Sequence, residues 1–161
     1  MNYKRLGSLA LLLIILAFPA SASMVSLLLI ETGLSERVPR AQYSSVWEGG
    51  LMEAFFDAGY IVTNSPVLRM ENKPSRDLSS FMEHDLDQAI LGGAEYFIIG
   101  FLEYQFRGGR PVPISAEFKI YTTNSQKLIH EQSFPAGTGR NLDEEYRLAH
   151  NAGRIIISHI R

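Results

Sequence analysis

The sequence predicts an α/β (α+β) fold: a mixed sheet of about five strands with three helices, in the order β-α-β-α-β-β-β-α. Three observations predict it. Apolar runs at residues 27–30 and 96–102 are typical of strands that are covered on both faces. Two segments between these runs place apolar side chains at helical spacing. Residues 114–121 alternate between apolar and polar side chains, as a half-buried antiparallel strand does.

The first strand is predicted at residues 24–32, and a helix follows somewhere between residues 39 and 58. Ser45 and Glu48 would form a capping box for this helix. Gly49-Gly50 weakens helix propensity, so we expect it to permit a close approach of the helix to the sheet. The apolar or small face of this helix comprises Trp47, Gly50, Leu51, Ala54, Phe55 and Ala58. Trp47 is the only tryptophan of the chain, and we expect it to lie in the core.

Gly59 is expected to end this helix, and residues 60–62 open the second strand. Residues 64–75 form a polar connection. A second helix, at roughly residues 76–91, is predicted to bury Leu78, Phe81, Met82, Leu86, Ala89 and Ile90. Residues 95–106 carry the strongest strand signal in the chain, which favours a central position in the sheet.

Residues 107–113, rich in Gly, Pro and Arg, are interpreted as a connector to the alternating strand. Residues 123–126 are predicted to be a hairpin turn, and residues 127–134 the returning strand. Asn141 with Glu144 caps the last helix. Its buried face is predicted to comprise Leu142, Tyr146, Ala149, Gly153, Ile156 and Ile160.

Residues 1–22 are typical of a secretory signal peptide. The positively charged residues Lys4 and Arg5 precede an apolar core at residues 6–18. This core has about 13 residues, whereas a helix that spans a membrane needs about 20. Small residues at the −3 and −1 positions predict cleavage between Ala22 and Ser23. We therefore expect one globular envelope domain at residues 23–161, exported to the periplasm; an uncleaved signal anchor is the alternative.

Composition excludes several classes of function. The chain of 161 residues has no cysteine, which excludes disulfides, thiolate metal sites, cysteine nucleophiles and a covalent lipid anchor on an N-terminal cysteine. A formal net charge of −2 argues against nucleic acid as a partner, because that requires a dense basic surface.

Catalytic patterns are missing from the sequence. It contains no G-x-S-x-G, P-loop, G-x-G-x-x-G or H-E-x-x-H motif. The histidines, which do not pair at helical i, i+4 spacing, are His84, His130, His150 and His159. We therefore expect no catalytic residues, no metal, no cofactor and no enzymatic activity.

Two loops carry the residue types of protein contacts. Arg69 and Lys73 lie in the connection before the second helix, and Tyr104, Arg107 and Arg110 lie around the end of the central strand. Arginine together with aromatic side chains is typical of interaction hot spots. These five residues are the predicted partner-binding residues; an ordinary solvated loop is the alternative.

Three segments carry a resemblance to a known group. They are the helix-to-strand junctions at residues 55–62 (FFDAGYIV) and 89–100 (AILGGAEYFIIG), and the hairpin at residues 118–129 (FKIYTTNSQKLI). In order and spacing they resemble the small envelope domain of the curli-secretion lipoprotein, the lipoprotein activators of penicillin-binding proteins and the N-terminal domain of the Tol-Pal periplasmic protein. The resemblance covers about residues 24–160.

The resemblance implies a non-enzymatic adaptor or assembly domain in a bacterial envelope, in cell-wall synthase regulation or in outer-membrane or flagellar assembly. The chain departs from the pattern in two ways. It has no cysteine to carry a lipid, and Ser125 or Gln126 stands where the last hairpin turn has a glycine. We therefore expect a periplasmic protein that associates with the outer membrane through a partner.

The leading hypothesis is contact with another envelope protein. The first alternative is a small-ligand or cell-wall-fragment binding domain, with a cleft between the sheet and residues 64–75. The second is an enzyme of unrecognised class, in which His130 would meet a carboxylate in a concave site. A homo-oligomer is also possible, through an exposed edge of the hairpin at residues 114–134.

Overall fold

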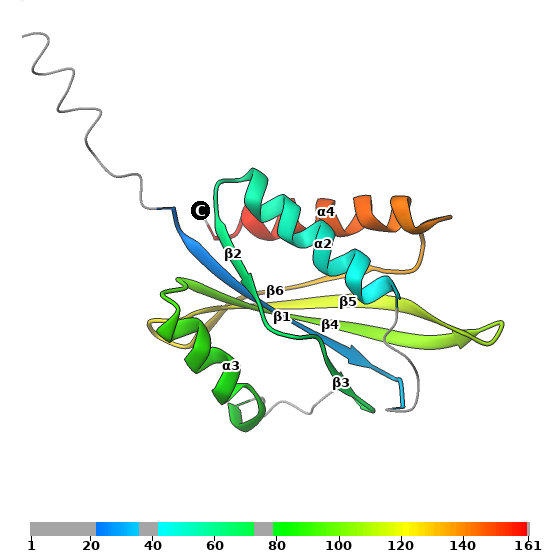
Figure 1. Ribbon diagram of the computed structural model, residues 1–161, viewed down its shortest axis with the longest axis horizontal. Helices are drawn as coiled ribbons and strands as arrows, with labels where there is room; N and C mark the ends of the chain where they lie inside the picture. The colour runs from blue at the N-terminus through cyan, green and yellow to red at the C-terminus, as the bar shows by residue number, and fades with distance from the viewer. Residues whose placement is uncertain (1–21, 36–41, 73–78, 161) are drawn as a thin grey trace, which may run out of the picture.

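A mixed sheet forms the centre of the computed structural model, which describes residues 22–35, 42–72 and 79–160 (Figure 1). The strands are β1 (Met24–Thr32), β2 (Ile61–Asn64), β3 (Leu68–Met70), β4 (Tyr96–Arg107), β5 (Arg110–Thr122) and β6 (Lys127–Pro135). Their order is β2-β1-β4-β5-β6, with β3 also paired to β1. β1 is parallel to β2, β3 and β4, whereas β4, β5 and β6 are antiparallel. The predicted fold class and order of elements are confirmed.

β3 is an addition to the prediction. Within the connection predicted to be a polar loop, Leu68–Met70 pairs with Ile30–Thr32 of β1. β2 and β3 thus follow one another along the same side of β1. The predicted cleft between the sheet and residues 64–75 is wrong for this stretch, because β3 is itself an edge of the sheet.

Helices cover both faces of the sheet. α2 (Gln42–Asp57) and α4 (Leu142–Ile157) lie side by side on one face, and α3 (Ser79–Leu91) lies on the other (Figure 1). Alternate residues of β1 and β4 therefore enter two separate apolar clusters. Both central strands are covered on both faces, which is why their sequences read as continuous apolar runs.

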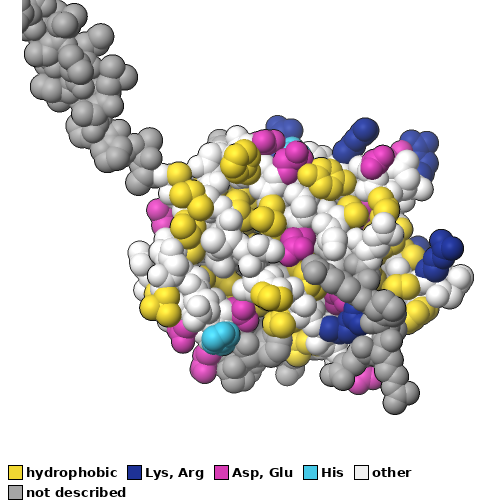
Figure 2. All heavy atoms as spheres, viewed as in Figure 1, with side chains coloured by type: hydrophobic (Ala, Val, Ile, Leu, Met, Phe, Trp, Pro, Cys, Tyr) yellow, Lys and Arg dark blue, Asp and Glu magenta, His cyan; other side chains and the backbone are white. Residues whose placement is uncertain are grey.

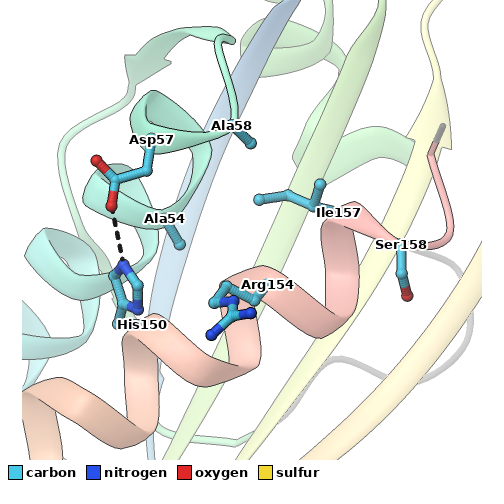
Figure 3. A pocket seen from close by; sticks show the side chains of 7 residues that line it. All are labelled: Ala54, Asp57, Ala58, His150, Arg154, Ile157 and Ser158. Atoms are coloured by element: carbon cyan, nitrogen blue, oxygen red, sulfur yellow. Dashed lines mark hydrogen bonds and ion pairs between the residues drawn. The ribbon is translucent and has the colours of Figure 1, made fainter.

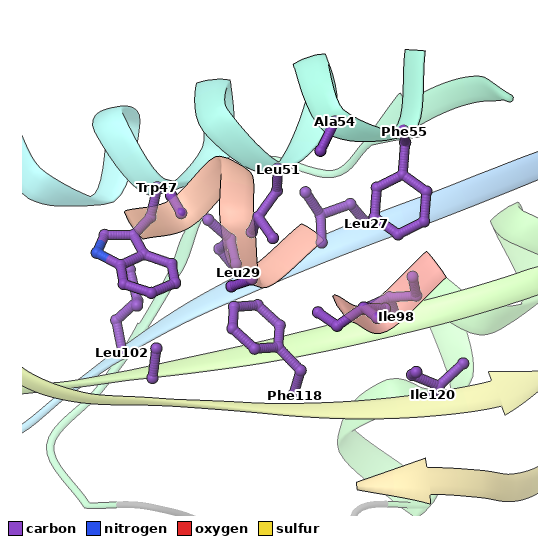
Figure 4. Packing of buried hydrophobic residues seen from close by; sticks show 14 of the residues in the cluster. Leu27, Leu29, Trp47, Leu51, Ala54, Phe55, Ile98, Leu102, Phe118 and Ile120 are labelled. Atoms are coloured by element: carbon purple, nitrogen blue, oxygen red, sulfur yellow. The ribbon is translucent and has the colours of Figure 1, made fainter. Parts of the chain in front are cut away.

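The larger cluster lies between the sheet and α2 with α4. Trp47, Leu51 and Phe55 of α2 point toward the sheet (Figure 4), and the Trp47 ring stacks on Phe118 of β5 with centroids 6.0 Å apart. The predicted core position of Trp47 is confirmed. In α3, by contrast, Ile90 is exposed rather than buried. Leu78 lies outside the described residues, and so do the side chains of Phe81 and Met82.

Two details of α2 differ from the prediction. The helix begins at Gln42, so Ser45 and Glu48 lie inside it and do not cap it. The close approach expected at Gly50 exists, but its neighbour is α4 and not the sheet. A Cβ atom at Gly50 would lie 2.7 Å from the carbonyl oxygen of Tyr146, and one at Gly153 would lie 2.7 Å from Ala54 Cβ. Small residues let the two helices pack closely.

α4 follows the prediction. Asn141 caps it by accepting a hydrogen bond of 2.8 Å from the backbone N–H of Glu144. Ala149, Gly153 and Ile156 are buried on the predicted face, whereas Leu142 and Tyr146 are only half-buried and Ile160 is buried beyond the end of the helix. Its acidic first turn and Arg154 in its last turn both complement the helix dipole.

Candidate protein interface

The β4–β5 hairpin extends beyond the neighbouring strands. The last residue of β1, Thr32, pairs with Glu103, and the last residue of β6, Pro135, pairs with Ser115. Residues 104–107 and 110–113 pair only with each other, and they project from one end of the sheet (Figure 1). Residues 105–112 are referred to below as the hairpin tip.

A two-residue turn closes this tip. Gly108 and Gly109 have φ angles of 58° and 77°, the left-handed conformation that a type I′ turn requires at both central positions. The predicted connector at residues 107–113 is therefore wrong, since the segment is the end of one strand, a turn and the start of the next. Pro111 and Pro113 fit here because the side of β5 away from β4 has no neighbouring strand, so no ladder hydrogen bond is lost.

The hairpin tip presents one exposed aromatic side chain and two exposed cations. Phe106 is 55% exposed, and Arg107 and Arg110 are exposed and directly opposite each other in the ladder. Neither arginine forms an ion pair with another described residue. Because successive residues of a strand point to opposite faces, the Phe106 ring lies on one face of the hairpin and the two guanidinium groups lie on the other. An exposed phenyl ring and two such guanidinium groups on one projecting hairpin are well suited to a protein contact.

Tyr104 does not belong to this surface. Its side chain is buried, and its hydroxyl lies 2.7 Å from the Ser44 hydroxyl, which donates a 2.6 Å hydrogen bond to Glu31. Burial raises the pKa of Tyr104 well above its usual value, because the phenolate would lose its hydration. The expected surface role of Tyr104 is corrected to a role in the interior.

Arg69 is likewise part of the interior structure. It lies opposite Glu31 in the β1–β3 ladder, its Nε donates to Glu31 Oε2 over 2.8 Å, and its Nη2 contacts the same oxygen. The Glu31 side chain is 1% exposed and that of Arg69 16%. Arg69 therefore joins β3 to β1. Lys73 lies outside the described residues.

A second buried carboxylate, missed in the sequence, joins α4 to the loop before it. Glu145 accepts hydrogen bonds from the Trp47 indole N–H at 2.8 Å and from the backbone N–H groups of Gly137 and Gly139 at 2.6 and 3.0 Å. An acid in the first turn of a helix is ordinary surface composition. The one sequence signal was the pair Gly137 and Gly139, which indicates a loop whose backbone N–H groups can point toward the interior.

The outer surface between α2 and α4 is hollowed. A hollow of about 580 Å³ is lined by Ala54, Asp57, Ala58, His150, Arg154, Ile157 and Ser158 (Figure 3). His150 Nε2 lies 3.4 Å from Asp57 Oδ2 across it. In the adjoining depression Tyr146 donates a 2.9 Å hydrogen bond to Glu53, and this bond raises the pKa of Tyr146.

His130, the candidate for catalysis, has a different environment. Its ring stacks on that of His159 with centroids 3.7 Å apart, and its Nε2 has no hydrogen-bond partner among the described residues. Within the part of the chain that the structure describes, no three His, Asp or Glu side chains are grouped as a metal ion requires.

The predicted cleavage position lies directly beside the sheet. The Ser23 carbonyl accepts a 3.0 Å hydrogen bond from Ile61 N–H, and the Ser23 hydroxyl lies 3.1 Å from a carboxylate oxygen of Glu95. Ala22 is exposed. None of the helices described has the length and apolar character needed to cross a bilayer.

Comparison with known proteins shows the fold. No protein-family model and no curated protein matches the sequence. PelC from Paraburkholderia phytofirmans, solved as a dodecamer, shares the fold with a TM-score of 0.51 at 14% identity, over 86% of this chain and 87% of PelC.

Two further solved structures are weaker matches. Lipoprotein GNA1162 from Neisseria meningitidis has a TM-score of 0.41 at 12% identity, over 86% of this chain and 97% of that one. The LpoB C-terminal domain from Salmonella enterica has a TM-score of 0.39 at 14% identity, over 80% and 94%. The structural comparison therefore rests on PelC, and it shows the fold.

Proposed function

We propose that this protein is a non-enzymatic adaptor or assembly domain of the bacterial envelope, which binds another envelope protein through the hairpin tip. The observation that carries the proposal is the projecting β4–β5 hairpin, with Phe106 exposed on one face of its tip and Arg107 and Arg110 exposed on the other. The signal-peptide pattern of residues 1–22 and the fold shared with PelC support the envelope location.

The chemistry of the hairpin tip defines the kind of partner. The phenyl ring of Phe106, on one face of the tip, gains most from an apolar surface that excludes water, and the guanidinium groups on the other face pair with carboxylates. The ladder pairs of β4 and β5 on the strand side of the two-residue turn place these groups at the end of the hairpin before binding. The expected partner surface is therefore a cleft that receives the tip, with an apolar wall facing Phe106 and an acidic wall facing Arg107 and Arg110.

Capture from envelope fractions tests this proposal. The chain is crosslinked in cells, and recovered proteins are compared between the wild type, Phe106→Ala and the double charge reversal Arg107→Glu/Arg110→Glu. The matched control is Lys127→Glu/Arg140→Glu, which reverses two exposed cations outside the tip. We expect both tip variants to lose the partner and the control to keep it; equal recovery from all four would overturn the tip as the binding surface.

A second copy of this chain is one partner to test, because PelC was solved as a dodecamer. Sedimentation equilibrium of the wild type and of Arg107→Glu/Arg110→Glu measures self-association. If the tip makes the contact, only the wild type forms an oligomer.

The hollow between α2 and α4 favours a second candidate function, the binding of a small anionic cell-wall fragment. Arg154 lies at its rim with no ion-pair partner among the described residues, next to His150 (Figure 3). Titration with purified muropeptides, followed by calorimetry, tests this candidate. Binding that Arg154→Gln abolishes would support it, and the absence of heat at millimolar concentration would exclude it.

A further inference from the structure

Exposed apolar side chains concentrate at one end of the molecule. Among the described residues, the large hydrophobic side chains with substantial exposure are Phe56, Ile61, Ile90, Leu91, Phe106, Leu128, Ile129 and Ile155. All except Phe106 lie close to the end of the domain at which β1 begins. This end is called the leader end below, because residues 1–22 precede it.

The topology explains this concentration. β1, β2, β4 and β6 all begin at the leader end, and α2, α3 and α4 all finish there (Figure 1). Phe56 is next to last in α2, Leu91 is the last residue of α3, and Ile61 is the first residue of β2. Leu128 and Ile129 follow the first residue of β6, at the other edge of the sheet. The apolar side chains thus come from both faces and both edges of the sheet.

Two of these side chains are almost fully in water. Phe56 is 75% exposed and Leu91 79% exposed, on helices that cover opposite faces of the sheet. Apolar side chains gather over the start of β1 and β2 in the view of Figure 2. Single exposed apolar residues are ordinary on a soluble domain, but their concentration at one end marks a contact surface.

The position of the leader indicates what this surface contacts. The apolar segment of the signal peptide ends at residue 18, and Ser23 already bonds to the first residue of β2. The five Cα–Cα steps from residue 18 to Ser23 span at most about 18 Å when fully extended. Whenever the leader is inserted in a bilayer, the leader end is therefore held next to the lipid.

We infer that the leader end is a lipid-contacting surface that keeps the domain at the membrane. Phe56, Leu91 and Ile61 would enter the interfacial region of the bilayer, as the apolar face of a peripheral protein does. The chain has no cysteine to carry a lipid, so in the cleaved product the folded surface alone would make this contact. The hairpin tip, at the opposite end, then points away from the membrane toward a partner.

The charge at the leader end predicts which lipids bind. Asp57 and Glu95 lie there together with Lys127 and Arg154, so these charges balance and the end has no net basic character. Attraction to anionic headgroups is therefore not required, and the contact is mainly apolar. Binding should be similar on neutral and anionic vesicles and change little with salt.

The absence of cysteine makes a direct test possible in the full chain. Single substitutions Phe56→Cys, Leu91→Cys and, as the matched control, Phe106→Cys each introduce one thiol for a nitroxide label. Vesicles of phosphatidylethanolamine with phosphatidylglycerol, and of phosphatidylcholine alone, are added to the purified protein. Collision of the label with oxygen, which partitions into lipid, and with an aqueous nickel chelate reports where each position lies.

We expect the labels at positions 56 and 91 to become lipid-accessible on both vesicles and the label at position 106 to remain aqueous. Phe56→Ser/Leu91→Ser should weaken vesicle binding roughly tenfold or more, with unchanged Trp47 fluorescence as the check on folding. Aqueous labels at all three positions would overturn the inference. Protection of positions 56 and 91 without vesicles, rising with protein concentration, would also overturn it and assign the surface to a second copy. Partner capture by the hairpin tip is measured separately, so the two proposals can fail independently.

Discussion

Glu31 and Arg69 form the contact that holds the short strand β3 on the sheet. The ion pair is almost completely buried, and Glu31 also accepts a hydrogen bond from Ser44. Removing one member of a buried pair leaves the other charge without compensation, which costs about 3 kcal/mol. We expect Glu31→Gln and Arg69→Met each to lower the free energy of unfolding by this amount, measured by urea denaturation.

The double variant Glu31→Leu/Arg69→Met provides the control for this prediction. Replacing both charges with apolar side chains leaves no uncompensated charge, so its loss of stability should be smaller than that of either single variant. Losses that simply add would contradict the account. Partner capture by folded Arg69→Met should equal that of the wild type, because Arg69 is not at the hairpin tip.

Glu145 has a comparable role at the start of α4. Its carboxylate accepts three N–H donors, and an amide at this position would turn an NH₂ group toward at least one of them. An unsatisfied buried donor costs roughly 1–3 kcal/mol. Glu145→Gln should therefore destabilise the fold by about 2 kcal/mol and change the fluorescence of Trp47, the only tryptophan.

The neighbouring Glu144→Gln is the matched control. Glu144 lies on the surface, where the hydrogen bonds from Arg140 lower the pKa of its carboxyl group. We expect little change in stability and none in Trp47 emission. If both variants behaved alike, the three hydrogen bonds to Glu145 would not carry the stability assigned to them.

At the scale of elements, loops on either side support the hairpin at its base. A Cβ atom at Gly33 would lie 2.5 Å from the carbonyl oxygen of Tyr104, and one at Gly137, whose φ is 65°, would overlap the carbonyl oxygen of Pro113. We expect Gly137→Ala to cost about 3 kcal/mol of stability, since a left-handed conformation and a backbone clash are combined.

Gly109→Ala separates these two contributions. Gly109 has a φ of 77°, but its Cβ position is open. The cost should be that of the left-handed conformation alone, about 1 kcal/mol. Chemical denaturation of both variants measures the difference, and equal losses would show that the loop at Gly137 does not pack against the hairpin.

Periodic elements could be predicted from the sequence, and irregular ones could not. The helices and the long strands follow repeating apolar patterns that their burial explains. β3 has only three residues, and its pairing depends on a buried ion pair between distant segments. Gly and Pro in residues 107–113 were interpreted as a connector because they usually interrupt strands. In the structure the prolines lie where β5 has no strand beside it on the side away from β4, so they interrupt no ladder.

The candidate interface was predictable only in part for the same reason. The exposure of Arg107 and Arg110 follows from their place beside a turn, whereas the burial of Tyr104 depends on Ser44 and Glu31, which no local pattern connects to it. The position at which the resembling proteins have a glycine in the turn of the last hairpin could be located from the local sequence. Gln126 stands there with a φ of 53°, in the region that glycine adopts freely.

At the scale of the whole molecule, the predicted signal peptide at residues 1–22 would determine how the domain is delivered. Cleavage between Ala22 and Ser23 removes two cations and no acid, which leaves 13 of the 15 cations against 17 acids and changes the formal charge from −2 to −4. We expect the full chain, expressed in a bacterium, to give a product that begins at Ser23, because Ala20 and Ala22 suit a signal peptidase and the apolar core is too short to span.

Intact-mass measurement of the product, with the cells fractionated, tests this. Substituting Ala22→Tyr should block cleavage and retain the full mass in the membrane fraction, whereas Ala17→Tyr, inside the apolar core and away from the cleavage position, should leave processing unchanged. A wild-type product of full mass would instead identify the leader as a retained anchor. In that case the leader end would be fixed to the membrane by the chain itself, and Phe56 and Leu91 would add to an attachment that already exists.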